Sequence, residues 1–384
     1  MNNPLLEQFI GISGLIIYVT TSAGIYSIFA LGLNLQWGFT GLINFGVVGF
    51  MTLGAYTSVL LTVVGVPFIL AVLMGAILAA ILGLLIGLST LRLREDYLAI
   101  VTIGVSELVR LVASNEEWLT RGVRGLQGYP LPLNIEAGLP MKILLTVVFS
   151  LLALYAQWTL YKSLAYQWKQ NKEIQGKSYQ PRKPFSLIVW GIITTSLILI
   201  VYLAWIIALW FDSYEYNQGL MVLVLLVLAI VYASLELLVN SPWGRVLKSI
   251  REDEEVPRAL GKNILLYKLQ AFMLGGAIAG TAGAFFAWQL RAIYPDRFEP
   301  LITFNTWIIV VLGGSGSNAG TLLGAVIFWS YDSLTRFILP QLGISSQSQA
   351  GYFRIMIIGL ILMILMVWRP QGILGKKEEL TLGR

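Results

Sequence analysis

The chain has 384 residues, of which 57% are hydrophobic and 12% are charged, and its 26 basic and 20 acidic side chains leave a net charge of +6. Soluble domains are about 45–50% apolar and about 25% charged, so the composition excludes an ordinary soluble protein and indicates an integral membrane protein. The chain has neither cysteine nor histidine. This excludes disulfides, thiolate nucleophiles, histidine catalysis and metal sites built from these two residues, and we expect no bound metal.

Long apolar segments follow one another along the whole chain. A membrane-crossing helix needs about 20 mostly apolar residues. For segments of this kind, the helix is the structure that satisfies all backbone hydrogen bonds within lipid. We therefore predict an all-α fold, a polytopic integral membrane protein with about 10–11 transmembrane helices in a single domain over residues 1–384. The candidate spans are residues 9–33, 43–64, 67–91, 97–113, 141–163, 185–210, 219–240, 264–290, 300–313, 318–338 and 351–368. Two of them, 97–113 and 300–313, are short, and we expect these to be broken or re-entrant.

Basic residues are concentrated in four connections between the spans. Cytoplasmic loops of membrane proteins carry an excess of lysine and arginine, so we predict that all four are cytoplasmic. They are the segment with Arg92 and Arg94, the basic loop 161–184, the loop 241–263, and the tail with Arg369, Lys376, Lys377 and Arg384. The predicted outer loops are residues 114–140, 211–218, 291–299 and 339–350. The side of the N-terminus stays open, and the first span, which lacks a basic leader, is expected to be uncleaved.

The first polar interruption is NLQWGFTGLINFG, residues 34–46. Its polar side chains are Asn34, Gln36, Thr40 and Asn44, and its glycines interrupt the helical pattern. Non-helical backbone at membrane depth survives only where it is buried in protein or lines a cavity, and broken helices of transporters present such backbone to the substrate. The four polar residues are therefore candidates for a substrate pathway. The alternative is a polar turn at the membrane surface.

Ionisable residues inside the spans are further candidates for function. Glu107 and Arg110 lie three residues apart on one face of a predicted helix, where they can pair. Glu107 therefore joins the candidates for the substrate pathway; the alternative is that both side chains reach water at the outer end of a short helix. Asp332 and Arg336, four residues apart, allow the same two interpretations.

Small residues recur at intervals of four in two spans. The first set is Gly75, Ala79, Gly83 and Gly87; the second span has Gly276 with Gly280, and Gly275 with Ala279 and Gly283. Such faces let helix backbones approach closely. They predict packing within this chain or, alternatively, packing against a second membrane subunit.

No phosphate-binding loop of the type G-x-x-x-x-G-K-[ST] occurs in the sequence. The glycines of VLGGSGSNAGTLLGA have the wrong spacing and no preceding strand, so we predict a tight cytoplasmic turn between two spans there. We therefore expect this chain to hydrolyse no ATP and to be no enzyme.

The densest charge lies in GRVLKSIREDEEVPRALGKN, residues 244–263, where nine of twenty residues are charged. A cap residue, an apolar stripe, four successive acids, a proline and a glycine predict a helix, a break, a short helix and a return to the membrane near Ile264. The cap is Ser241, the stripe is Val246, Leu247 and Ile250, the proline is Pro257 and the glycine is Gly261. A basic membrane anchor would explain the basic residues alone, whereas an apolar centre with a charged rim favours docking to a soluble protein.

This segment resembles the cytoplasmic loop of branched-chain amino acid ABC-transporter permeases of the LivM type. Further stretches resemble the same family in the same order: GLNLQWGFTGLINFGVVGFMTLGAYTSVLL (32–61), LRLREDYLAIVTIGVSELVRLV (91–112), KLQAFMLGGAIAGTAGAFFA (268–287), VVLGGSGSNAGTLLGAVIF (310–328) and WRPQGILG (368–375). The resemblance implies an amino acid importer in the bacterial cytoplasmic (inner) membrane. Two related permease chains would form the pathway in the lipid, two ATPase subunits would dock below, and an external binding protein would deliver the substrate.

The resemblance also implies how the parts act. Alternating access would be driven by ATP on the partner subunits, with no cofactor on this chain and no nucleic acid partner. The loop would be the coupling helix that sits in a groove of the ATPase. The positions that match its motif are Gly244, Arg245, Ile250, Arg251, Glu252, Asp253, Ala259, Leu260 and Gly261.

The sequence departs from the family pattern in two regions, and the second, the longer middle region, leaves the substrate open. The outer loop LTRGVRGLQG is more basic than in the family because of Arg121 and Arg124, and the region 131–218 is longer, with an apparent extra helical pair around the basic loop. Related permeases for urea and short amides also vary in length and are an alternative. Outside this class, an ion-coupled transporter would need a coupling carboxylate such as Glu107, and a membrane enzyme is disfavoured by the missing histidine and cysteine.

Overall fold

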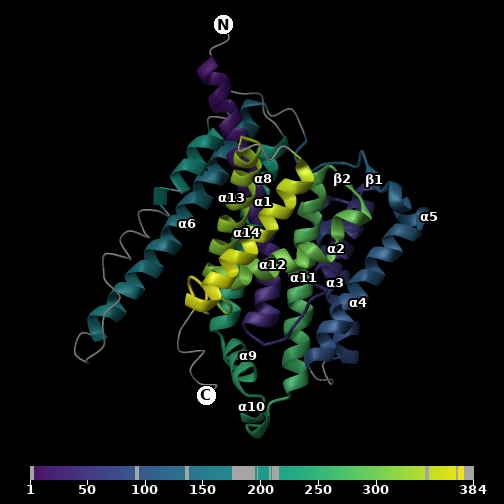
Figure 1. Ribbon diagram of the computed structural model, residues 1–384, viewed down its shortest axis with the longest axis vertical. Helices are drawn as coiled ribbons and strands as arrows, with labels where there is room; N and C mark the ends of the chain where they lie inside the picture. The colour runs from purple at the N-terminus through teal and green to yellow at the C-terminus, as the bar shows by residue number, and fades with distance from the viewer. Residues whose placement is uncertain are drawn as a thin grey trace. The chain divides into compact units, whose positions relative to one another are not determined.

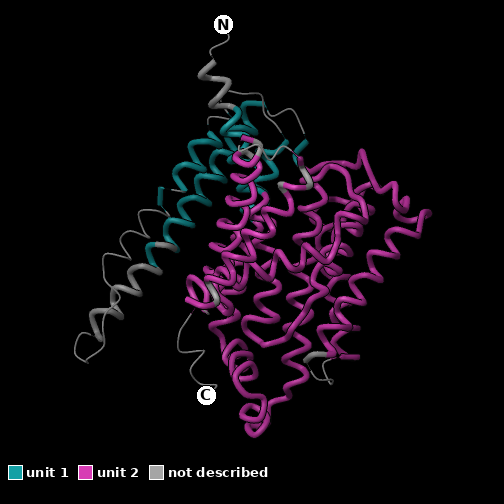
Figure 2. Tube along the Cα trace, in the orientation of Figure 1, with its two compact units in different colours: residues 1–21, 133–226 teal, residues 22–132, 227–384 magenta. Residues whose placement is uncertain are grey.

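The computed structural model describes residues 4–90, 95–134, 138–174, 195–196, 198–206, 209, 216–341, 346–368 and 371–375. The chain divides into two compact units, residues 1–21 with 133–226, and residues 22–132 with 227–384 (Figure 2). Helices make up nearly all of the described structure (Figure 1). The basic residues Arg92, Arg94 and Arg369, those of 175–184 and those of 376–384 lie outside the described residues, so their predicted sidedness stays a prediction.

The first unit, unit 1, is packed around one tryptophan. Its helices are the first part of α1 (Pro4–Leu33), α6 (Leu139–Ile174), a helical stretch over residues 198–206, and the first part of α8 (Tyr216–Asn240). Trp205 is fully buried, its ring lies 4.7 Å from that of Phe149, and its Nε1 donates to the carbonyl of Gln218 at 3.2 Å. The other buried residues of this core are Ile17, Leu145, Leu209, Met221 and Val222.

Helix α6 is longer than its predicted span 141–163. It continues to Ile174, so residues 161–174 are helical and the first part of the predicted basic loop 161–184 is not a loop. The reason is local, because these residues include neither glycine nor proline and are rich in good helix formers such as Leu, Ala, Gln and Lys. A second helix packs on α6, as expected for an added helical pair: Ser150 and Tyr202 share a hydrogen bond of 2.9 Å.

The second unit, unit 2, holds the remaining elements. Its helices are α2 (Val47–Val63), α3 (Phe68–Thr90), α4 (Glu95–Asn115), α5 (Glu117–Thr120), α9 (Pro242–Glu252), α10 (Glu255–Ala259), α11 (Ile264–Leu290), α12 (Pro300–Gly313), α13 (Asn318–Gln341) and α14 (Gln347–Trp368). Shorter elements are the π-helix η1 (Asn34–Gly38), the 3₁₀ turns η2 (Gly122–Arg124) and η3 (Pro295–Phe298), and the antiparallel strands β1 (Leu126–Gln127) and β2 (Ala292–Ile293). The β1–β2 pair joins two loops that are predicted to lie on the same outer side.

The core of unit 2 is the packing of α2, α3 and α11 through the small-residue faces. A Cβ on Gly54 of α2 would lie 2.1 Å from the carbonyl oxygen of Gly280, and a Cβ on Gly280 would lie 2.6 Å from the Cβ of Ala79 on α3. A Cβ on Gly75 of α3 would lie 2.9 Å from the carbonyl oxygen of Gly54. The small residues therefore serve packing within this chain, which was one of the two predicted uses.

The all-α, polytopic prediction is confirmed. Six helices in the described residues are long and apolar enough to cross a membrane, α2 and residues 351–364 form shorter apolar helices, and α12 and α13 form a pair bent by 119°. That bend fits the expectation of a broken or re-entrant element at 300–313. The same expectation for 97–113 was wrong, because α4 is a continuous helix of 21 residues that begins before the first apolar position.

Candidate functional site

The first candidate site is the break between α1 and α2, residues 34–46, which we call the broken segment. The helix widens into η1 at Asn34–Gly38 and the backbone then leaves the helix until Val47, with Gly41 at a φ of +82°. Asn34, Gln36, Thr40 and Asn44 are all buried. Residues 39–46 are therefore non-helical backbone enclosed by protein, which fits the pathway interpretation, and the depth of this segment in a membrane stays a prediction.

The four predicted pathway residues all make hydrogen bonds inside the chain. Asn34 donates to the Asn318 side chain at 3.3 Å and accepts from the backbone nitrogen of Gly316 at 2.9 Å. Gln36 donates to the carbonyl of Phe272 on α11 at 2.9 Å. Asn44 donates to the Gln36 side chain at 2.8 Å, and Thr40 donates to the Leu35 carbonyl at 2.9 Å. In this conformation the four side chains hold the break together, and their contact with substrate stays a prediction.

Residues that the sequence did not single out complete the broken segment. Thr102 of α4 accepts from the backbone nitrogen of Phe45 at 3.2 Å, and Trp307 of α12 donates its Nε1 to the carbonyl of Asn44 at 3.0 Å. Thr303 of α12 accepts from the nitrogen of Val48 at 3.1 Å. The available signal was weak, since it consisted of single polar side chains within apolar helices.

The turn between α12 and α13, residues 314–317, lies against the broken segment. Besides its bonds to Asn34, this turn is closed by the end of the described chain, residues 371–375. Ile373 and Leu374 donate their backbone nitrogens to the carbonyls of Leu312 and Gly313 at 3.0 and 2.9 Å. The predicted tight turn in VLGGSGSNAG is present, and residues 371–375 bind to it through these two hydrogen bonds.

The second candidate site is the charged loop, and its predicted order of elements is confirmed. Helix α9 ends at Glu252, α10 follows the break, and α11 begins at Ile264. At the break Asp253 accepts from the nitrogen of Glu255 at 2.8 Å, and Gly261 follows α10 with a φ of +74°. Ser241 stands at the start of α9, but its hydroxyl donates backwards to the Leu238 carbonyl at 2.6 Å instead of capping the helix.

The apolar stripe of α9 faces its own chain. Leu247 and Ile250 are buried, and Leu247 belongs to a core cluster with Leu31, Leu35 and Phe39. Leu247 and Ile250 are therefore covered by the chain itself, and of the predicted stripe Val246 alone is half-buried. Periodicity predicts that a helix has an apolar face, but it does not say whether that face meets another protein or the chain itself.

The nine motif positions of the loop divide between an inner and an outer side. Gly244 and Ile250 are buried, and Arg251 is half-buried and donates a hydrogen bond to the carbonyl of Gly38 in the broken segment. The others are exposed: Arg245, Glu252, Asp253, Ala259, Leu260 and Gly261. Two large apolar side chains of this outer side face solvent, Leu260 with 73% and Val256 with 52% of their surface exposed.

One of the four acids forms an ion pair with a buried lysine. Lys268, in the first turns of α11, is 8% exposed and donates to the carboxylate of Glu254. A buried ammonium group needs such a partner, because desolvation otherwise disfavours its charge. Glu254 thus anchors α10 to α11, while its three acidic neighbours, Glu252, Asp253 and Glu255, remain exposed.

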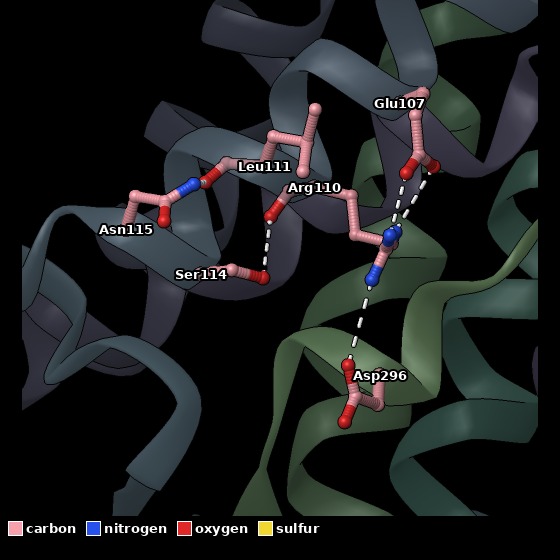
Figure 3. Close-up of polar contacts among 6 residues, drawn as sticks. All are labelled: Glu107, Arg110, Leu111, Ser114, Asn115 and Asp296. Atoms are coloured by element: carbon pink, nitrogen blue, oxygen red, sulfur yellow. Dashed lines mark hydrogen bonds and ion pairs between the residues drawn. The ribbon is translucent and has the colours of Figure 1, made fainter.

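In the second half of α4, Glu107 and Arg110 form the predicted ion pair (Figure 3). Two nitrogens of Arg110 donate to the two oxygens of Glu107, Nε to Oε2 at 3.0 Å and Nη2 to Oε1 at 2.5 Å. Its Nη1 reaches Asp296 of η3 at 3.4 Å, so the guanidinium links α4 to the segment before α12. A carboxylate held by two arginine nitrogens is poorly suited to pick up and release a coupling proton.

The second predicted pair is also formed. Asp332 accepts from Nε of Arg336 at 2.8 Å and from Nη1 of Arg354 on α14 at 2.9 Å. The carboxylate therefore joins α13 to α14. This arrangement fits a structural contact between two spans.

Comparison with known proteins identifies the family. The sequence model described as "Branched-chain amino acid transport system / permease component" matches residues 15–366. The chain belongs to this family. It is 30% identical over 357 residues to the high-affinity branched-chain amino acid transport system permease protein LivM of Escherichia coli (strain K12), which covers 93% of this chain and 69% of that protein.

More distant relatives extend the match within the branched-chain amino acid permease family. The probable branched-chain amino acid transport permease protein LivM of Methanocaldococcus jannaschii is 24% identical over 400 residues, 93% of this chain and 92% of that protein. BraD of Pseudomonas aeruginosa, a high-affinity permease protein of the same kind of system, is 27% identical over 158 residues, 41% of this chain and 48% of BraD. No solved structure matches the chain. Family membership and the apolar helices together establish a multi-pass membrane protein of the permease class.

Proposed function

We propose that the chain is the membrane-spanning permease subunit of an ABC importer that takes up branched-chain or other neutral amino acids. The observation that carries the proposal is the family match over residues 15–366. In this proposal the chain works by alternating access in the bacterial inner membrane beside a second, related permease subunit. Two separate ATPase subunits supply the energy, and an extracytoplasmic binding protein delivers the amino acid.

The outer side of α9 and α10 is the proposed contact with an ATPase subunit. It combines exposed acids with two exposed apolar side chains, Val256 and Leu260. Protein interfaces commonly have such an apolar centre within a polar rim. The acids Glu252, Asp253 and Glu255 would meet basic side chains of the ATPase groove, and this charge match would set the orientation of docking more than its strength.

The broken segment is the proposed moving part near the pathway. After η1 its backbone lacks the regular hydrogen bonds of a helix. It is held by side chains of α4 and α12, and by its own side chains, which bond to backbone groups of α11 and of the α12–α13 turn. Rearranged side-chain bonds of this kind can give two discrete conformations, as alternating access requires. The ion-coupled alternative gains no support from Glu107, whose carboxylate is paired on both oxygens.

Reconstitution tests the proposal. The chain, its related permease subunit and the ATPase subunits are co-expressed, placed in liposomes with the binding protein, and assayed with labelled leucine, alanine and urea. Uptake of amino acids that requires ATP inside the liposomes is expected. Uptake without the ATPase subunits, or uptake of urea alone, would refute the proposed mechanism or the proposed substrate class.

A charge-reversal pair tests the docking surface. Glu252→Lys with Asp253→Lys is expected to reduce co-purification of the ATPase while membrane insertion stays normal. The matched control is Glu116→Lys with Glu117→Lys, an exposed pair of neighbouring acids in the predicted outer loop. Equal co-purification of the ATPase with both double variants would contradict the assignment.

A further inference from the structure

The inner side of α9 is attached to the broken segment at several points. Arg251 donates to the carbonyl of Gly38, and a Cβ on Gly41 would lie 3.5 Å from Cγ and 3.6 Å from Cα of Arg251. One turn earlier, the Lys248 ammonium lies 5.6 Å from the centre of the Phe39 ring. Leu247 packs in the same core cluster as Phe39. Successive turns of α9 thus contact a short stretch of the chain, residues 38–41.

The chemistry of this contact follows from where the helix ends. Gly38 is the last residue of η1, so its carbonyl lies among the final carbonyls of the α1–η1 helix, which lack the partners that a continuing helix would supply. A helix C-terminus carries partial negative charge and favours cations. The guanidinium of Arg251 donates directly to it, and the ammonium of Lys248 lies over the ring of the adjoining Phe39. The break in the helix creates the acceptor that holds α9.

The broken segment in turn bonds to most of the helices around it. Gln36 bonds to α11, Asn44 to α12, and the backbone of Phe45 to α4. Asn34 bonds to Gly316 in the α12–α13 turn and to Asn318 at the start of α13. A displacement of the broken segment is therefore applied to four helices through the hydrogen bonds of Asn34, Gln36, Asn44 and Phe45, in an interior that is close-packed and transmits strain.

We propose that Arg251 fixes α9 to the broken segment so that the two move as one body when the ATPase moves α9, and that the broken segment passes this movement to α4, α11, α12 and α13. This rests on the proposed function. It assigns Arg251 a positioning role, in which it joins the docking surface to the transport pathway without touching either ATP or substrate. In this proposal residues 34–46 have two conformations. The ATPase side and the substrate side of the transporter both shift the equilibrium between them.

A cross-link tests the single-body movement. The chain has no cysteine, so Phe39→Cys with Lys248→Cys introduces a unique pair, which a short bifunctional maleimide joins in the reconstituted complex. Uptake by the cross-linked complex is expected to stay within about twofold of the same variant before cross-linking, because the linked parts keep their distance through the cycle. A loss of about tenfold or more on cross-linking would show that α9 moves against the segment and would overturn the proposal.

Substitution of Arg251 tests its role separately. In Arg251→Ala the amount of substrate moved per ATP hydrolysed is expected to fall by about tenfold, with ATPase co-purification and basal ATP hydrolysis retained. Arg251→Lys, which keeps the charge and one donor, should recover part of this ratio. Lys162→Ala, an exposed basic residue on α6, is the control and should leave the ratio unchanged.

The outcomes separate the two proposals. If the wild-type complex moves no amino acid, the proposed function fails. If it does, and Arg251→Ala keeps the wild-type ratio, the role of Arg251 fails while the function stands. If Arg251→Ala does not assemble, the cross-linked pair, which retains Arg251, decides alone.

Discussion

Replacing a glycine by alanine in this chain should change its stability in opposite directions at two positions. At Gly54, in the centre of the α2–α3–α11 core, the new Cβ would lie 2.1 Å from the carbonyl oxygen of Gly280 and 2.5 Å from its Cα. Both are backbone atoms of another helix, so α2 and α11 must separate to accept the methyl group. Such overpacking costs about 1–3 kcal/mol, and more where backbones must move.

Gly104, on the exposed face of α4, is the matched control. A Cβ there has no atom within 4 Å, and the backbone is already helical. Gly104→Ala should therefore stabilise the helix by about 0.5–1 kcal/mol, because glycine loses more backbone entropy on folding than alanine. The two variants differ from the wild type by the same single methyl group, so composition and hydrophobicity are matched.

Thermal unfolding in detergent, followed by size-exclusion chromatography of a fluorescent fusion, measures both. We expect the midpoint of Gly54→Ala to fall by several degrees and that of Gly104→Ala to stay level or rise, since about 1 kcal/mol corresponds to a few degrees in proteins of some 150–250 residues. An unchanged midpoint for Gly54→Ala, or equal losses in both variants, would refute the close backbone packing described here.

Three further changes follow from single contacts. Glu254→Gln removes the partner of the buried Lys268 and should cost about 1–3 kcal/mol of stability, whereas Glu255→Gln, next to it and exposed, should cost almost nothing in the same melting assay. Leu260→Asp should leave the melting temperature unchanged, because the side chain is 73% exposed, yet reduce ATPase co-purification; normal co-purification would remove Leu260 from the docking surface. Asn34→Ala leaves the nitrogen of Gly316 without its acceptor and should lower the melting temperature by an amount that corresponds to about 1–3 kcal/mol, and no shift would mean that this bond is dispensable.

The sequence predicted well those features that depend on neighbours along the chain. The α9–break–α10 order followed from a proline, a glycine and a run of acids, and the Glu107–Arg110 pair followed from spacing on one helix. The break after Leu33 followed from polar and glycine residues in an apolar context. In each case the determining residues lie within a few positions of the feature that they determine.

What the sequence could not predict depends on contacts between distant segments. Asn34 is 284 residues from Asn318, so no local pattern indicates their bond. The sequence left open whether the stripe of α9 or its acidic run contacts a partner, because amphipathicity does not identify what covers a face. Of the contacts that were missed, the Glu254–Lys268 pair was the easiest to predict from the sequence. Lys268 is a single basic residue within an otherwise apolar helix, and an acid lies 14 residues before it.

The pairing of residues 371–375 with the α12–α13 turn has a consequence for biosynthesis. The chain is made from the N-terminus, so the broken segment, α9 and the turn all leave the ribosome before the residues that close the turn. Every membrane helix of the described residues can thus be inserted while the carbonyls of Leu312 and Gly313 still lack their final donors, Ile373 and Leu374. Residues 371–375 close the turn only after α14 has been made, so a chain that stops at Trp368 would carry the described membrane helices but lack the donors that close the α12–α13 turn.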